Sequence, residues 1–405
     1  MQISNLSEQK RILLVSPQPF YQDRGTPIAI RHVIEALSAR DYKVDLLTFP
    51  IGADVALPGL RIIRSMRIPG IRQVPIGLSL RKLLLDIALF ATMFRILRKR
   101  DYWCVHAVEE AVFPALLIAR RRGIPVLYDM QSCLSDQLRR HALFGRPFMQ
   151  RLVQRLECWA LRTSSVVVGS AGLAPYVGQV APNSRVHEWN FPGQRPQTSA
   201  SAIDRLRREY DLPHDARIIL YSGNFARYQG VATLIEAIPA VVQREPRAIF
   251  MLVGAEPETT SPEVTEAMAS APRNAVRILP RQPRESLPSF LALADVLVSP
   301  REGGDNLPLK IFDYMAVGKP IVATDYPIHR TVLDEDRAVL VPPTAEAMAD
   351  GIVSVLGDHR FANRLGSAAQ AYSNKHLGLA NFQRFVERVY GALAVDLGPT
   401  VRPAP

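Results

Sequence analysis

The chain of 405 residues is long enough for two or three domains, and its composition, 48% hydrophobic and 21% charged, favours large folded cores over disorder. No run of about 18 apolar residues occurs, which excludes a polytopic membrane protein. Met1 to Gln9 is polar and lacks the apolar core of a secretory signal. The three cysteines (Cys104, Cys133 and Cys158) form no CxxC pair, which favours a reducing compartment and argues against a zinc site or a disulfide framework.

The net charge of +11 originates in the first half of the chain. Residues 1–190 contain 26 Lys and Arg against 14 Asp and Glu, whereas the remainder contains 23 against 24. Between residues 61 and 100, Asp86 is the single acid among ten cations: Arg61, Arg64, Arg67, Arg72, Arg81, Lys82, Arg95, Arg98, Lys99 and Arg100. Such a segment attracts polyanions, either an anionic membrane or a nucleic acid.

Apolar runs alternate with amphipathic segments along the whole chain. In the first half we expect strands at 11–16, 43–49, 103–108, 125–130 and 165–170, and helices at 28–39, 81–100, 111–121 and 146–162. Residues 191–204, rich in Pro, Gly, Ser and Thr, form the best domain boundary. Beyond it we expect strands at 217–223, 248–254, 276–279, 295–300 and 320–325, helices at 230–243, 261–270, 285–293 and 308–317, and a helical end over 344–395.

This alternation predicts an α/β protein with two Rossmann-like domains, whose parallel sheets face a central cleft. The expected domains are residues 1–195 and residues 196–375. Residues 376–405 form a C-terminal helix and tail that can return to the first domain. Chemistry is expected at the carboxyl ends of the strands.

Four segments together resemble the retaining glycosyltransferases of the GT-B fold, family four. They are RILLVSPQPFYQDRGTPIAIRHVIEALSARDYKVDLLT (11–48), YSGNFARYQGVATLIEAI (221–238), LVGAE (252–256) and REGGDNLPLKIFDYMAVGKPIVATD (301–325). The resemblance covers almost the whole chain in order, and the last segment is similar to the family's donor-binding motif.

A nucleotide sugar needs backbone N–H groups and a cation for its diphosphate, and a carboxylate for its ribose diol. Pro308 suits the first turn of a helix whose preceding N–H groups can face phosphate. By resemblance, Asp313 holds the ribose. The full expected donor set is Gly25, Thr26, Gly223, Asn224, Arg227, Gly254, Gly304, Asn306, Leu307, Lys310 and Asp313.

The chain departs from the family pattern at the phosphate cations. Asn224 and Gln229 stand where the family usually has Arg and Lys, and Lys310 stands eight residues after Glu302, where the family has a second Glu. We infer that the phosphate cation has moved to Lys310, with Arg227 as its partner. Either Glu302 meets the donor sugar through a longer loop, or Lys310 takes over part of that site. The alternatives are that Lys310 is a surface lysine and that the protein is an inactive relative.

The first domain offers acidic candidates after its expected strand at 103–108. The family often has H-x-H here; His106 matches the first His, Val108 occupies the second position, and Glu109 and Glu110 follow. A lone His on an apolar strand is more often a satisfied core residue. We expect His106, Glu109, Glu110 and Glu302 as the catalytic residues, with Asp129 and Gln131 as further polar candidates.

Residues 81–100 predict a helix with a broad apolar face between basic ends, too short to span a bilayer. It can lie on an anionic membrane surface, or it can be a core helix with a solvated basic end. The preceding RSMRIPGIRQVP favours the membrane. No recognition motif for nucleic acid is present, so we expect no nucleic-acid partner.

The resemblance implies a retaining hexosyltransferase. It would move a sugar from a UDP- or GDP-linked donor to a lipid or lipid-linked acceptor, in glycolipid or polysaccharide biosynthesis. The resemblance implies that residues 1–195 bind the acceptor and that residues 196–375 bind the nucleotide sugar. We expect a cytoplasmic protein held peripherally on the inner membrane face through residues 61–100. No cofactor or obligatory metal is implied. The alternatives are a GT-B nucleotide-sugar epimerase and a non-catalytic nucleotide-sugar-binding scaffold subunit.

Overall fold

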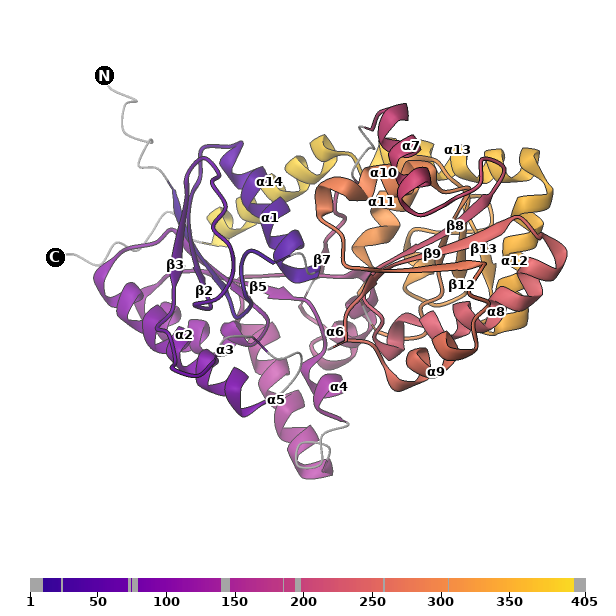
Figure 1. Ribbon diagram of the computed structural model, residues 1–405. Helices are drawn as coiled ribbons and strands as arrows, with labels where there is room; N and C mark the ends of the chain where they lie inside the picture. The colour runs from indigo at the N-terminus through magenta and orange to yellow at the C-terminus, as the bar shows by residue number, and fades with distance from the viewer. Residues whose placement is uncertain are drawn as a thin grey trace, which may run out of the picture. The chain divides into compact units, whose positions relative to one another are not determined.

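The computed structural model describes residues 10–22, 25–71, 74, 79–139, 146–184, 186–193, 198–257, 259–304 and 306–396. The chain divides into two compact units (Figure 1). The first contains residues 1–190 and 380–405, and the second contains residues 191–379. Each unit has its own parallel sheet and its own buried core.

The first unit holds a seven-stranded sheet in the order β3-β2-β1-β4-β5-β6-β7, in which every neighbouring pair is parallel. Its strands are β1 (Arg11–Ser16), β2 (Lys43–Thr48), β3 (Leu60–Arg64), β4 (Cys104–Val108), β5 (Val126–Met130), β6 (Val166–Gly169) and β7 (Val186–Glu188). Its helices are α1 (Gly25–Ser38), α2 (Leu80–Lys99), α3 (Val112–Ala119), α4 (Leu134–Arg139), α5 (Pro147–Thr163), α6 (Ala174–Val180) and α14 (Leu379–Asp396), with 3-10 turns at Glu109–Ala111, Arg120–Arg122 and Ala171–Leu173.

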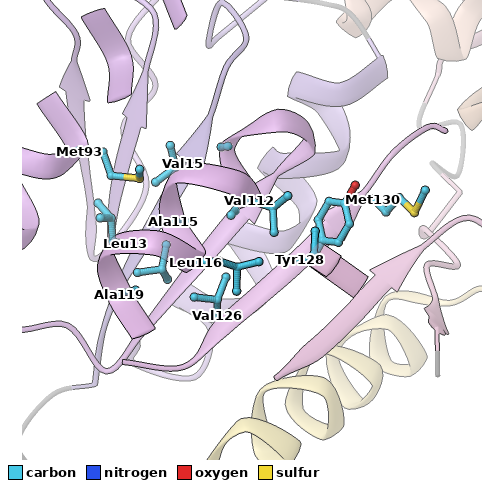
Figure 2. Close-up of a cluster of buried hydrophobic side chains, with 14 of the residues drawn as sticks. Leu13, Val15, Met93, Val112, Ala115, Leu116, Ala119, Val126, Tyr128 and Met130 are labelled. Carbon is cyan, nitrogen blue, oxygen red and sulfur yellow. The ribbon is translucent and has the colours of Figure 1, made fainter. Parts of the chain in front are cut away.

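The core of this unit follows from the alternation of side chains along each strand. Leu13 and Val15 of β1 point to the face that α2 and α3 cover, where they pack in one apolar cluster. Figure 2 shows this cluster, with Met93 from α2, four residues of α3, and Val126, Tyr128 and Met130 from β5. Helix α14 lies against the other face, because the hydroxyl of its Tyr390 lies 2.6 Å from the ring of His106 on β4.

The second unit has a six-stranded parallel sheet in the order β10-β9-β8-β11-β12-β13, the order of a dinucleotide-binding fold. Its strands are β8 (Arg217–Ser222), β9 (Ala248–Ala255), β10 (Val276–Pro280), β11 (Val296–Ser299), β12 (Ile321–Thr324) and β13 (Val339–Val341). Its helices are α7 (Ala200–Glu209), α8 (Val231–Arg244), α9 (Pro262–Ser270), α10 (Leu287–Leu293), α11 (Leu309–Val317), α12 (Ala345–Gly357) and α13 (His359–His376), with 3-10 turns at Arg227–Gln229, Arg284–Ser286 and His329–Thr331.

The two parallel sheets confirm the predicted α/β architecture, and the strands found from sequence end within two residues of their expected positions. Three strands were not predicted: β3, β7 and β13, each at the edge of its sheet. Helix α7 lies partly inside the segment expected to be a linker. The chain crosses between units at residues 190–191 and 379–380, so that α14 belongs to the first unit.

Candidate active site

In the second unit, two glycine-containing loops follow β8 and β11, the neighbouring strands between which the strand order reverses. Gly223 directly follows β8, and its N–H donates to the carbonyl of Val253 at 2.9 Å. A Cβ on Gly254, whose φ is +117°, would lie 2.3 Å from the carbonyl oxygen of Gly223. The backbones therefore approach as closely as only glycine allows, at the edge where α/β sheets bind ligands.

The loop after β11 is fastened to the loop after β8. The N–H of Glu302 donates to the carbonyl of Tyr228 at 3.0 Å. Gly230 has a φ of +66°, and a Cβ there would lie 1.9 Å from the carbonyl oxygen of Pro300. The exposed carboxylate of Glu302 accepts a hydrogen bond from the Thr233 hydroxyl at 2.5 Å, in the first turn of α8. These contacts bring Glu302 beside the first glycine loop.

Lys310, in the first turn of α11, points to that loop. Its Nζ lies 3.3 Å from the side-chain oxygen of Gln229 and 3.9 Å from the centre of the Tyr221 ring. A Cβ on Gly223 would lie 3.1 Å from the same nitrogen. Burial, with the nearby charge of Arg301, lowers the pKa of Lys310 well below its usual value. The Lys310 amine thus lies next to the two loops, beside an amide oxygen and an aromatic ring and near a second cation.

Arg301 is a cation of this site that sequence reasoning missed. It is buried, its Nε donates to the carbonyl of Gly303 at 2.6 Å, and its guanidinium lies 5.1 Å from the Tyr228 ring centre. A Cβ on Gly304, whose φ is +89°, would lie 2.4 Å from its Nη2. Its position directly before Glu302 in the motif was the available signal.

Arg227 does not join Lys310 as expected. Its side chain is 76% exposed and its Nε lies 3.5 Å from the carboxylate of Glu263 on α9. The cations at the glycine loop are therefore Lys310 and Arg301, and not the expected Lys310 and Arg227, because Arg227 is turned toward a surface acid.

The remaining expected donor residues of the second unit lie around the same loops. Asp313 projects from α11 and is only 4% exposed. Asn224 shapes its own turn, because its side-chain oxygen accepts from the N–H of Ala226 at 3.2 Å and its carbonyl accepts from the Tyr221 hydroxyl at 2.7 Å. Asn306 and Leu307 precede the helix and are partly exposed.

In the first unit, His106 lies in the core. It is 0% exposed, with Nδ1 at 2.6 Å from the Tyr390 hydroxyl and Nε2 at 3.3 Å from Asp129 Oδ2. Asp129 also accepts from the ring nitrogen of Trp189 at 2.9 Å and the amide of Gln131 at 2.6 Å. Both ring nitrogens have protein partners, so the expectation that His106 contacts the substrate does not fit this geometry.

Glu109 and Glu110 form a strained turn at the carboxyl end of β4. Glu109 has a φ of +52°, in the left-handed region that few non-glycine residues adopt. Its carboxyl accepts from the Ser132 hydroxyl at 2.8 Å. Burial, reinforced by the charge of Glu110, raises the pKa of Glu109 well above its usual value. Glu110 forms an ion pair with Lys82 of α2.

Gly25 and Thr26 open helix α1, which has 14 residues. Apart from its chain neighbours and its own helix backbone, no described residue has an atom within 4 Å of a Cβ built on Gly25, and the φ of Gly25 is not in the left-handed region. The backbone therefore does not require glycine there, and the space beside it is open.

Two properties of the described residues bear on what the protein binds. No group of three or more His, Cys, Asp or Glu among them is arranged to hold a metal ion. Over the same described ranges, no helix combines the length and the apolar character that crossing a membrane requires.

Two units of this kind, each with a Rossmann-like parallel sheet, form the architecture of the GT-B glycosyltransferases, and comparison with known families agrees. The family described as "Glycosyl transferase 4-like domain" matches residues 24–187, and "Glycosyl transferases group 1" matches residues 202–372. The chain belongs to these group 1 glycosyltransferases.

Two curated relatives align with nearly the full chain. It is 24% identical to the phosphatidyl-myo-inositol mannosyltransferase of Mycolicibacterium smegmatis, over 94% of this chain and 95% of the relative. It is 24% identical to the enzyme of the same name from Mycobacterium tuberculosis, strain H37Rv, over 89% and 91%.

Solved structures share the fold at lower identity. Sucrose-phosphate synthase from Thermosynechococcus elongatus has a TM-score of 0.75 at 22% identity, over 96% of this chain and 100% of that one. The Anabaena protein Alr3699/HepE in complex with UDP-glucose has a TM-score of 0.72 at 16% identity, over 94% and 99%.

Proposed function

We propose that this glycosyltransferase is a retaining hexosyltransferase that moves a sugar from a UDP- or GDP-linked donor to a hydroxyl of a lipid or lipid-linked glycan. The observation that carries the proposal is Lys310, whose amine lies beside Gln229 and the Gly223 loop. Two kinds of relative support it: the mannosyltransferases named for phosphatidyl-myo-inositol, and Alr3699/HepE, solved with UDP-glucose.

The donor half of the reaction belongs to the second unit. Lys310, in the first turn of α11, and Arg301, in the loop before that helix, supply positive charge for the diphosphate. Asp313 holds the ribose diol, and Glu302 meets the donor sugar. Two cations at the leaving diphosphate stabilise the charge that develops as the glycosidic bond breaks, so the reaction proceeds without an obligatory metal.

The acceptor half belongs to the first unit. In a front-face displacement, the bond from the anomeric carbon to the acceptor oxygen forms on the face where the bond to the phosphate oxygen breaks. The acceptor proton passes to the leaving phosphate oxygen, so no separate base is needed. Glu109, at the end of β4, orients the acceptor hydroxyl by a hydrogen bond, and the protein contributes position and charge.

A membrane surface presents the acceptor, at the inner face in the cytoplasm. Helix α2 buries Leu85, Leu89 and Met93 in the core of the first unit, yet it also carries exposed apolar residues. The two alternatives of a core helix and a membrane-surface helix are therefore compatible. The exposed residues are Leu80, Leu83, Leu84, Ile87 and Phe94. An apolar row beside cations suits an anionic bilayer.

The structure reduces the number of cations that can serve this surface. Arg61 and Arg100 pair with buried Asp45, Arg64 pairs with Asp54, and Lys82 pairs with Asp86 and Glu110. Among the described residues of 61–100, the cations outside such pairs are Arg67, Arg81, Arg95, Arg98 and Lys99.

The deciding experiment has two stages. UDP- and GDP-sugars are screened for thermal stabilisation of the protein, and the stabilising donor is then incubated with lipid acceptors in anionic vesicles. Transfer with the anomeric configuration kept, read by NMR of the product, is the expected result. Epimerised nucleotide sugar, or donor binding with neither transfer nor slow hydrolysis, would overturn it in favour of the epimerase or the scaffold.

A further inference from the structure

Lys82 connects the surface helix α2 to the acidic turn at the end of β4. It lies in the first turn of α2, where its N–H is capped by the Ser79 hydroxyl at 3.1 Å. Its Nζ lies 3.0 Å from one oxygen of Asp86 and also contacts Glu110, 28 residues further along the chain. The Lys82 side chain is only 16% exposed, so this bridge runs along the inner side of the helix.

The charges around Lys82 show that it is held as a cation. Burial opposes its charge, but Glu110 and Asp86 outweigh that effect and raise the pKa of Lys82. Burial raises the pKa of Asp86 to about 6, against the attraction of Lys82. Without the ammonium, two partly buried carboxylates would face each other beside Glu109.

The turn at Glu109 and Glu110, which Lys82 contacts, has a strained backbone that its side-chain contacts restrain. Glu109 keeps its left-handed backbone between two fastenings: Ser132 donates to its carboxyl at 2.8 Å, and Glu110, the next residue, is bound by Lys82. The Ser132 side is braced too, because buried Glu157 of α5 accepts from the N–H of Leu134 at 2.7 Å. Loss of either fastening would free the turn to relax.

We propose that Lys82 is a positioning residue: through Glu110 it sets the orientation of Glu109, so that helix α2, which carries the exposed apolar row, also aligns the acceptor site. The inference rests on the proposed function, in which Glu109 orients the acceptor hydroxyl. Lys82 itself touches no substrate. Through it, the position of α2 and the orientation of Glu109 depend on each other.

The test compares Lys82→Met with Lys82→Arg and with Arg122→Met. Arg122 is a control, since it also gives up an ion pair of the first unit, to Asp101 at 2.8 Å, but the pair precedes β4 and β5, at the amino ends of the strands, whereas Glu109 and Glu110 follow the carboxyl end of β4. With acceptor in detergent micelles, Lys82→Met should lower kcat by roughly tenfold to a hundredfold, the cost of misplacing a reacting group. Its KM for the donor should not change, Lys82→Arg should recover most of kcat, and Arg122→Met should behave as wild type.

A double-mutant cycle separates positioning from folding. Thermal melting first establishes that each variant is folded. If Lys82 acts through Glu110, then Lys82→Met/Glu110→Gln should be no slower than Lys82→Met alone, because the second change removes a partner that is already released. Independent, multiplicative losses would overturn the proposal, as would a folded Lys82→Met variant with wild-type kcat.

Should Lys82→Met fail to fold, the kcat of Glu110→Gln decides: a drop with unchanged donor KM supports the proposal, and a wild-type value overturns it. Absence of transfer by the wild-type protein, in contrast, counts against the proposed function itself.

Discussion

The amine of Lys310 lies 3.3 Å from the side-chain oxygen of Gln229. Gln229 belongs to the loop after β8 and stands at a position where the family usually has a cation, whereas Lys310 comes from the start of α11. The two positions are 81 residues apart in sequence. The amine from the second loop thus projects into the space beside Gly223 of the first.

Lys310→Met should weaken binding of a nucleoside diphosphate by about tenfold to a hundredfold, because a hydrogen bond to a charged group is worth roughly 1.5–3 kcal/mol. Binding of the nucleoside should hardly change. Calorimetry with both ligands measures the difference, and Lys319→Met, just beyond the same helix, is the control. Equal losses for both ligands would show that Lys310 does not touch phosphate.

Binding of the diphosphate should take up a proton. The pKa of Lys310 is lowered in the free protein by burial and by Arg301, and a bound anion favours the ammonium and raises it again. Between the two pKa values, binding therefore consumes a proton, and affinity falls as pH rises through the lowered value. Titrations in buffers of different ionisation enthalpy measure the uptake, which Lys310→Met should abolish. No uptake at any pH at which the protein stays folded would contradict this assignment.

Asp313→Asn should erase the preference for ribose. If the carboxylate holds the diol, wild-type protein should bind a ribonucleoside diphosphate at least about tenfold more tightly than its 2′-deoxy form, and the variant should bind both alike. Because Asp313 is only 4% exposed, asparagine is used to keep the volume, and a melting curve checks the fold. A wild-type protein that binds both ligands equally would remove Asp313 from the ribose site.

Gly230→Ala should destabilise the second unit. The new Cβ would lie 1.9 Å from the carbonyl oxygen of Pro300, at a φ of +66°, and left-handed strain alone costs about 1–3 kcal/mol. Gly357→Ala is the matched control, since no atom lies within 4 Å of its Cβ position. Urea unfolding should show a lower midpoint for Gly230→Ala only; equal midpoints would mean that the two loops can separate freely.

Binding to anionic vesicles should depend on the cations of residues 61–100 that form no ion pair among the described residues. Each cation near an anionic surface contributes about 1 kcal/mol, so replacing Arg95, Arg98 and Lys99 by Gln should weaken sedimentation with anionic vesicles by roughly a hundredfold. Binding of the wild type should fall steeply with added salt, and neutral vesicles should bind poorly. Arg205, Arg207 and Arg208 of α7, changed together to Gln, form a control of equal charge. A wild-type protein that ignores anionic vesicles at low salt would refute the membrane surface.

The sequence by itself determined the α/β class and most strand positions, because a buried parallel strand is a continuous apolar run that local composition reveals. Edge strands such as β3, whose residues are all partly exposed, lack that run and were missed. Helix α7 was missed because its polar residues resemble a linker, although Ser199 caps it.

Only the tertiary structure decided which partner each charged residue meets. Lys82 pairs with Glu110, Arg61 with Asp45 and Lys310 with Gln229, and His106 is closed off by Tyr390 from the far end of the chain. The motif placed Lys310 and Glu302 near one another, but neither the direction of Lys310 nor the exposure of Arg227 could be read from it. Such pairings depend on how distant segments pack, and an ion pair or a buried hydrogen bond forms only where the fold brings both groups within a few ångströms.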